Sequence, residues 1–255
     1  PARSLYLGAM YLRRHGYETA DLDHWIDQAL QVFDRAAQAG RSFDEGGGGY
    51  SWLVGNHLME VQFAQGDPRW ARSEKLLHYA DLAAVVLNSQ ARFVPYGDSS
   101  TYYARMGGGG ANILLRAAEL HDDGGCKWVA EHAAPEETAA DLLARDVEAE
   151  PPVRHLGLFV LPLDPVIDRW MALPRFPGYP PPPRMPNVPP EESFDKLTFR
   201  GGWAEDDDYL LLQGFGDGSH GHPDANSISQ LQVRGRILLA DCDYIRRWPR
   251  EHNMV

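Results

Sequence analysis

The chain has 255 residues, 44% of them apolar, and a formal net charge of −12 at pH 7. This length allows one large domain or two modest ones, and we expect two. The acidic charge without clustered Lys and Arg excludes nucleic acid as the main partner, and no apolar run is long enough for a transmembrane helix.

The first 145 residues are predicted to be mainly helical. Apolar residues recur at three- and four-residue steps over residues 22–37, behind the N-cap candidates Asp21 and Asp23 and ahead of a stop at Gly40. A chain that begins at Pro1 within an apparent helix and stops within an apparent strand is expected to be a fragment. Short turns marked by Gly or Pro indicate antiparallel helices in a bundle or helical toroid.

The other helices follow from caps and periodicity. Asp67 and Pro68 predict the start of a helix that continues to Leu87, because Pro is favoured at a first helical position. Four more helices are expected over residues 50–65, 109–120, 124–132 and 136–145.

Helix breakers dominate the middle of the chain. An apolar run over residues 155–161 is followed by Asp164 and Pro165, which predict a short helix ending near Leu173. Nine prolines then lie within residues 174–190, and such a stretch joins neither a sheet interior nor a helix.

Strand patterns follow the prolines. We expect strands over residues 197–200, 209–213, 227–233 and 236–240, with a turn at Arg234 and Gly235. The sequence therefore predicts a multidomain α and β chain, with a helical domain over residues 1–147, a Pro-rich linker with a short helix over 148–192, and a β domain over 193–255.

Titratable side chains gather near the end of the chain. His220, His222 and Asp224 are two residues apart, so an extended strand would place them on one face. Asp241 would return on an antiparallel strand, and His252 would follow on the next. Two imidazoles and one carboxylate suit Zn²⁺ and leave one histidine for proton transfer. The competing interpretation is a surface turn with ordinary polar residues.

Two glycine-rich segments enter helices. Residues 46–49 are all glycine and precede Tyr50, whose phenolate a helix N-terminus would stabilise, although a flexible loop with a packed Tyr50 is the alternative. The second segment, residues 106–110, lacks the Lys-Ser/Thr ending of a phosphate loop. Asp98 before it is expected to cap or brace a loop, with catalysis as the alternative. Trp52 and Tyr102 are candidate platforms for sugar rings, with core packing as the alternative.

Motifs in both halves resemble the heparinase II/III-like polysaccharide lyases. Phe194-Asp195-Lys196, the segment 199–203 and His220-Gly221-His222-Pro223-Asp224-Ala225-Asn226-Ser227 look like the opening of that family's sandwich. Phe43-Asp44-Glu45-Gly46 followed by Tyr50 is similar to the segment with the family's catalytic tyrosine. The resemblance implies a partial (α/α) toroid followed by a partial antiparallel β-sandwich.

The resemblance also implies an activity. It predicts a carbon–oxygen lyase that cleaves uronic-acid glycans by β-elimination, acts on an anionic polysaccharide or oligosaccharide, and is periplasmic or secreted. Tyr50 and His220 would be catalytic, and a structural Zn²⁺ without any organic cofactor would be held by His222, Asp241 and His252. Substrate binding is expected from Glu45, Trp52, Asp98, Tyr102 and Asn226.

The chain departs from the family pattern in two places. Cys242 and Asp243 stand where a Pro-Gly pair often follows the aspartate, and the family's Asn or His that neutralises the substrate carboxylate would lie upstream of Pro1. One alternative function is a non-catalytic glycan-binding protein or inactive homologue, which would not need Tyr50 and His220. Another is a cupin-like metal oxygenase, which would not explain the helical half.

Overall fold

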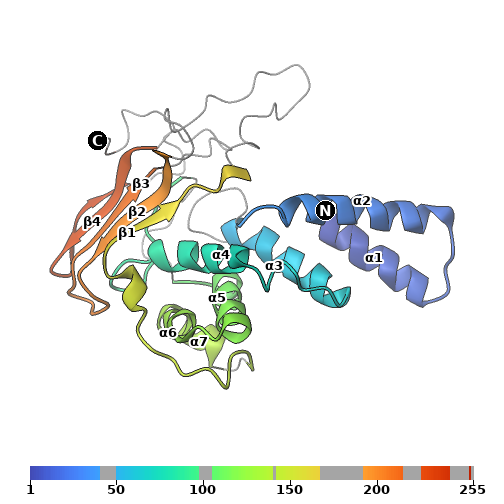
Figure 1. The fold of residues 1–255 in the computed structure, drawn as a ribbon, viewed down its shortest axis with the longest axis horizontal. Coiled ribbons are helices and arrows are strands. Elements are labelled where there is room, and N and C mark those ends of the chain that lie inside the picture. Colours follow the sequence, from blue (N-terminus) through green and yellow to red (C-terminus); the bar gives the residue numbers. More distant parts are fainter. Residues whose placement is uncertain are drawn as a thin grey trace, which may run out of the picture.

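A helical part precedes one antiparallel sheet in the computed structural model (Figure 1). The structure describes residues 1–40, 50–97, 105–139, 142–166, 192–214, 225–241 and 253. The expected succession of a helical part and a β part is confirmed. Among these described residues, no helix is both long and apolar enough to cross a bilayer.

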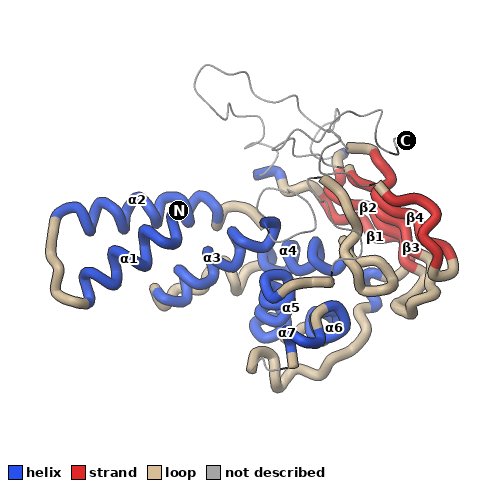
Figure 2. The backbone as a smooth tube through the Cα atoms, turned by 180° about the vertical axis from the view of Figure 1, so that it is seen from behind, coloured by secondary structure: helices blue, strands red, loops and turns tan. Residues whose placement is uncertain are grey.

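The first two helices form an antiparallel hairpin that projects from the rest of the molecule (Figure 2). Helix α1 spans Ala2–Arg14, and α2 spans Ala20–Ala36. Helix α2 buries Leu22, Ile26, Ala29 and Phe33, which are the three- and four-residue steps of the sequence pattern. It ends at Ala36, four residues before the expected stop at Gly40.

Four further helices form where helices are expected. They are α3 (Tyr50–Ala64), α4 (Glu74–Val85), α5 (Gly108–His121) and α6 (Gly124–Ala133). Three of them have bounds within two residues of the prediction, and α4 begins later than predicted. The predicted start at Asp67 and Pro68 is wrong, because α4 is capped by Ser73, whose hydroxyl accepts a hydrogen bond from the Lys75 amide at 3.3 Å.

The last predicted helix, over residues 136–145, is also wrong in extent. Among the described residues of this stretch, the one α-helix is α7 (Pro135–Thr138). The short turn between α5 and α6 uses Asp122 in the left-handed conformation, with φ of 55°, and Asp123 as the N-cap of α6. The carboxylate of Asp123 accepts from the Cys126 amide at 2.9 Å.

The sheet has five strands in chain order, each paired antiparallel with its neighbour. After a 3-10 turn, η1 (Val153–His155), come β1 (Gly157–Pro162), β2 (Phe194–Arg200), β3 (Tyr209–Gln213), β4 (Ser227–Val233) and β5 (Arg236–Ala240). Arg234 and Gly235 both have positive φ, 47° and 72°, which confirms the expected tight turn. Strand β1 lies within the predicted linker. Residues 157–162 therefore form a strand at the edge of the sheet, paired with β2.

The two faces of the sheet differ in polarity. Lys196, Thr198 and Arg200 alternate along β2 and are at most 2% exposed, and Arg200 donates to the carbonyl oxygen of Leu87 in the helical part. On the opposite face, Leu158 pairs with Phe199, and these two side chains are 67% and 43% exposed. The helix-facing side of the sheet therefore buries these polar side chains beside Tyr209 and Leu211, and the outward side carries exposed apolar side chains.

Side chains of the sheet reach the segment that follows α4. The amide of Asn88 donates to the Gln230 side chain at 3.0 Å, and the Gln90 amide donates to the Gly235 carbonyl oxygen at 3.1 Å. Tyr209 and Leu211 belong to the same buried apolar cluster as the helices. The helical part and the sheet thus share one core.

Candidate functional site

One end of the sheet carries two of the predicted site residues, Asn226 and Asp241, and we call it the site end. There Lys196 pairs with Gln213, and Gln213 pairs with Ser227 at the start of β4. Asn226 precedes that strand, has φ of 66°, and donates its backbone amide to the Gln213 carbonyl oxygen at 2.6 Å. Asn is among the few residues that adopt the left-handed conformation readily. Its own side chain is exposed at the site end.

Asp241 and Asn253 meet at neighbouring residues of β4. The Asp241 amide donates to the Ser229 carbonyl oxygen at 2.7 Å, and the Ile228 amide donates to the Asn253 carbonyl oxygen at 2.8 Å. The side-chain amide of Asn253 also donates to the Ile228 carbonyl oxygen at 3.4 Å. Asp241 is buried, at 6% exposure. Asp241 and Asn253, which lie before and after the expected zinc ligand His252 in the sequence, are therefore both bound to β4.

Most of the other predicted site residues lie outside the described residues. These are Glu45, Asp98, Tyr102, His220, His222 and His252, together with the side chain of Tyr50. Within the part of the chain that the structure describes, no three His, Cys, Asp or Glu side chains are grouped as metal ligands.

Tyr50 is the first residue of α3, as the sequence predicts. The start of this helix is fixed from two sides. Tyr79 on α4 donates to the Ser51 carbonyl oxygen, and Asn56 donates to the carbonyl oxygen of Gly109 on α5 at 2.9 Å. The backbone that carries Tyr50 is therefore held by α4 and α5.

Trp52 occupies a core position instead of an exposed platform. It is 2% exposed, and its ring stacks on Phe93 at 5.9 Å and lies tilted against Tyr79 at 5.6 Å. Its indole N–H has no hydrogen-bond partner among the residues that the structure describes. This burial favours core packing, the alternative interpretation of Trp52, over an exposed sugar platform.

A buried ion pair at the site end was not anticipated as a functional feature. Lys196 donates to Asp195 at 2.6 Å, both side chains are fully buried, and the ammonium lies 4.7 Å from the centre of the Tyr96 ring. The register of β1 and β2 skips Asp195, which marks a bulge. A bulge lets two consecutive residues point to the same side, and two adjacent charged residues in a strand were the signal for it.

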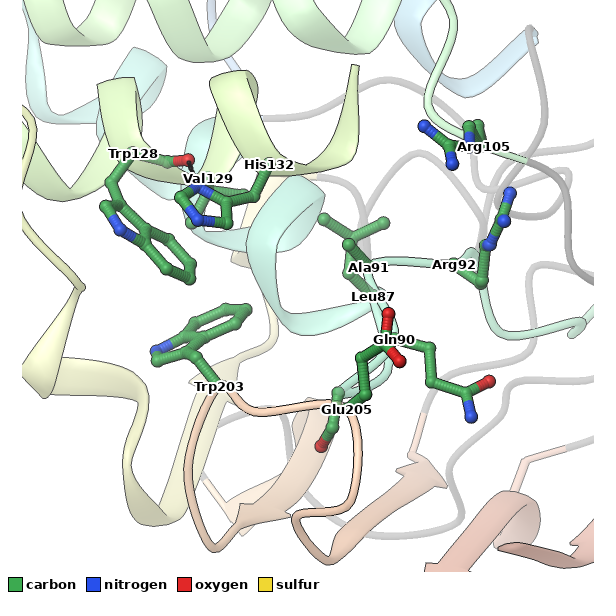
Figure 3. A pocket seen from close by; sticks show the side chains of 11 residues that line it. Leu87, Gln90, Ala91, Arg92, Arg105, Trp128, Val129, His132, Trp203 and Glu205 are labelled. Carbon is green, nitrogen blue, oxygen red and sulfur yellow. Dashed lines mark hydrogen bonds between the residues drawn. The ribbon is translucent and has the colours of Figure 1, made fainter. Parts of the chain in front are cut away.

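The opposite end of the sheet borders a cavity of about 390 Å³ (Figure 3). It lies between α6, the segment after α4 and the β2–β3 turn, and we call it the Trp203 pocket after the residue of that turn. The register places Arg200, Tyr209 and Gln232 at this end of the strands, so the pocket is separated from the site end by the length of the sheet.

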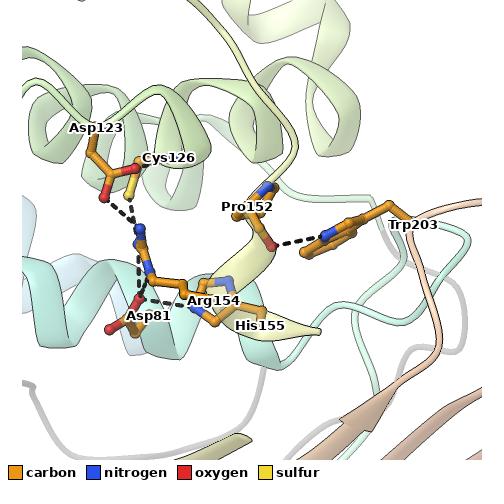
Figure 4. Close-up of polar contacts among 7 residues, drawn as sticks. All are labelled: Asp81, Asp123, Cys126, Pro152, Arg154, His155 and Trp203. Atoms are coloured by element: carbon orange, nitrogen blue, oxygen red, sulfur yellow. Dashed lines mark hydrogen bonds and ion pairs between the residues drawn. The ribbon is translucent and has the colours of Figure 1, made fainter. Parts of the chain in front are cut away.

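A polar cluster fastens η1 to α4 and α6 (Figure 4). Arg154 binds Asp81 at 2.9 Å and Asp123 at 2.6 Å, and its guanidinium donates to the Cys126 sulfur. Burial raises the pKa of both carboxyls, but hydrogen bonds and the Arg154 charge outweigh it, so each pKa lies below its usual value. Burial raises the pKa of the Cys126 thiol to about 12, so it stays protonated.

Two solved structures of heparinase III are similar to the chain in fold. One has a TM-score of 0.56 and 14% identity over 94% of this chain, and the other has a TM-score of 0.52 and 11% identity over 99%. No protein-family model matches the chain, and no curated protein matches its sequence. The chain spans about a third of the length of those two structures, 33% and 35%, and it has the heparinase III fold over that part.

Proposed function

We propose that the chain is part of a polysaccharide lyase that cleaves uronic-acid glycans by β-elimination. The observation that carries this proposal is the similarity in fold to heparinase III over 94% of the chain. The position of Tyr50 at the start of α3 supports it, because this is where the resemblance in sequence places the catalytic tyrosine. An anionic polysaccharide is then the substrate, and a periplasmic or secreted location goes with it.

The architecture that we propose is an (α/α) toroid followed by a β-sandwich. The outward apolar face of the sheet supports the sandwich, because Leu158, Val160 and Phe199 are 67%, 48% and 43% exposed on it. Apolar inner faces of two sheets bury each other in a sandwich. A second sheet over this face would remove these side chains from water.

The proposed reaction begins at C5 of a uronate. Its proton is weakly acidic, so the carboxylate must be neutralised and the forming enolate stabilised by nearby donors. Tyr50 or His220 removes the C5 proton, the electron pair forms the C4–C5 double bond, and the C4–oxygen bond breaks. Tyr50 protonates the departing oxygen. Asn226, with an exposed side chain at the site end, is a proposed substrate contact together with Glu45, Asp98 and Tyr102.

We propose a structural Zn²⁺ held by His222, Asp241 and His252. Two imidazoles and a carboxylate are a suitable donor set, and Asp241 is a buried carboxylate beside β4. Asn253 is bound to the next residue of β4, which supports the approach of His252 to Asp241. The metal would brace β4 against the end of β5, where Asp241 follows the strand.

The test is to incubate the purified full-length protein, of which this chain is proposed to be a part, with a panel of uronic-acid polysaccharides and to follow the ultraviolet absorbance of the unsaturated uronate. Tyr50→Phe should abolish the product, because the phenolic proton is needed at the leaving oxygen. Tyr17→Phe is the matched control, since Tyr17 is 62% exposed near the tip of the α1–α2 hairpin. Full activity of Tyr50→Phe would remove Tyr50 from the mechanism. Binding without any product in the wild type would favour the glycan-binding alternative.

A further inference from the structure

The Trp203 pocket has two chemically different walls (Figure 3). Trp128, His132 and Trp203 form an aromatic wall, and Arg92 and Arg105 lie together on the opposite side. Its volume of about 390 Å³ is within the range of small-molecule sites, which run from about 300 to 1,000 Å³.

The aromatic wall is held in place before any ligand arrives. Trp128 stacks on His132 at 3.5 Å and meets Trp203 edge to face at 5.3 Å. The indole of Trp203 donates to the Pro152 carbonyl oxygen at 3.3 Å, and the Arg200 guanidinium lies 3.7 Å from its ring centre. Burial lowers the pKa of Arg200 to about 10, so it remains charged at neutral pH. Rigid rings lose little conformational entropy on binding.

Ser89 also lines this pocket. The residue is 4% exposed, and within the part of the chain that the structure describes, its hydroxyl oxygen has no hydrogen-bond partner. A buried polar group without a partner is unfavourable, and a ligand hydroxyl would satisfy it. This is a second observation, independent of the arginines, that points to a bound ligand.

We propose that the Trp203 pocket binds an acidic sugar, a uronate whose carboxylate lies between Arg92 and Arg105. Guanidinium groups bind carboxylates through paired charge-assisted hydrogen bonds. The apolar face of the pyranose ring would pack on Trp128 and Trp203, and a ring hydroxyl would bond to Ser89. The choice of a sugar over other carboxylated rings rests on the proposed function. The pocket borders the end of the sheet opposite the site end.

Glu205 carries the opposing charge in this pocket. Its carboxylate would accept hydrogen bonds from sugar hydroxyls, but it also repels an anionic ligand. Removing this charge should therefore strengthen uronate binding, whereas removing an arginine should weaken it. The overall charge of −12 makes such local cations necessary for holding an anion.

The experiment is an NMR titration of the ¹⁵N-labelled protein with methyl glucuronide and, separately, with neutral methyl glucoside. Methyl glucuronide has no glycosidic bond at C4 and cannot be cleaved, so the result does not depend on lyase activity. We expect the glucuronide to shift the indole signals of Trp128 and Trp203 and the amide signals of Ser89 and Gln90, and the glucoside to bind at least about tenfold more weakly. Equal binding of both sugars, or shifts confined to other residues, would overturn the proposal.

Variants sharpen the test. Arg105→Gln should raise the Kd for the glucuronide about tenfold or more, and Glu205→Gln should lower it. Ser89→Ala should weaken binding without lowering stability, because the hydroxyl has no hydrogen-bond partner among the described residues. Arg35→Gln, an exposed residue on α2, makes the same charge change far from the pocket and should leave the Kd unchanged. An unchanged Kd for Arg105→Gln would contradict the site.

Discussion

Tyr209 on β3 donates a hydrogen bond to the carbonyl oxygen of Val85, the last residue of α4, at 2.5 Å. The last carbonyl groups of a helix have no partner within the helix, so this bond satisfies one of them. Both residues are buried, and burial raises the pKa of Tyr209, which keeps the phenol a donor at neutral pH. One hydroxyl therefore closes a helix end and joins the sheet to the helical part.

Removal of this hydroxyl should destabilise the protein. Tyr209→Phe leaves the Val85 carbonyl oxygen buried without its partner, so we expect the free energy of unfolding to fall by about 1–3 kcal/mol. Urea denaturation followed by circular dichroism measures this. Tyr11→Phe is the control, because Tyr11 is 62% exposed and should change the unfolding free energy little. Equal stability of the two variants would show that the bond contributes nothing.

Acid should weaken the protein through His155. This imidazole lies 2.9 Å from Asp81, and its second ring nitrogen is buried with no hydrogen-bond partner in the described part of the chain. Burial lowers its pKa despite the carboxylate. A lowered folded pKa means that the unfolded chain binds the proton more readily. The contribution to stability is therefore complete above the unfolded value of about 6.5 and is lost as the pH falls toward the folded pKa.

The measurement is the free energy of unfolding between pH 7 and pH 5. His155→Gln removes the titrating group, so its loss of stability over this range should be smaller than that of the wild type. Parallel curves of unfolding free energy against pH for the two proteins would show that His155 does not cause the loss of stability in acid. Asp81 and Asp123 act at lower pH, because their lowered pKa values make stability fall only below about 4.

Gly55 should not tolerate a side chain. A Cβ atom there would lie 2.2 Å from the ring of Tyr79, which is buried and bound to the Ser51 carbonyl oxygen. Gly55→Ala is expected to cost about 1–3 kcal/mol through overpacking. Gly8→Ala on α1 is the matched control, because nothing lies within 4 Å of its Cβ position, and it should stabilise the helix by about 0.5–1 kcal/mol. Thermal unfolding of both variants distinguishes a clash from helix propensity.

The proposed zinc site predicts a stability that depends on the metal. Asp241→Asn keeps the shape of the buried side chain but removes its charge, so the purified variant should contain less zinc and unfold at a lower temperature. A chelator should lower the Tm of the wild type and have little further effect on the variant. A wild-type protein that contains no zinc, with a Tm that a chelator does not change, would contradict the site.

Local patterns predicted the elements whose formation depends mainly on nearby residues. The apolar steps of α2 and the tight turn at Arg234 and Gly235 are examples. The start of α4 was misplaced, because Asp67 and Ser73 are both suitable N-cap residues. A tertiary contact, which the local sequence does not reveal, decides between the two. Trp70, between the two, is buried and donates to the Ala39 carbonyl oxygen at 2.8 Å.

The positions of candidate site residues could be predicted where they depend on strand order, and less well where they depend on packing. The antiparallel return that brings Asp241 beside β4 followed from the strand pattern. The burial of Trp52 did not, because Phe93 and Tyr79 are distant in sequence and a helical period does not distinguish a core face from a cleft face. The Trp203 pocket also combines residues from four separate segments, none with a recognisable motif.

The apolar outer face of the sheet has a practical consequence for handling the protein. Leu158, Val160 and Phe199 lie on it near the edge strand β1, whose outer side has no neighbouring strand among the described residues. Exposed apolar patches and open strand edges promote association between molecules. If nothing covers this face, loss of solubility at high concentration will precede unfolding. Light scattering against concentration would reveal it, and Val160→Lys should suppress it.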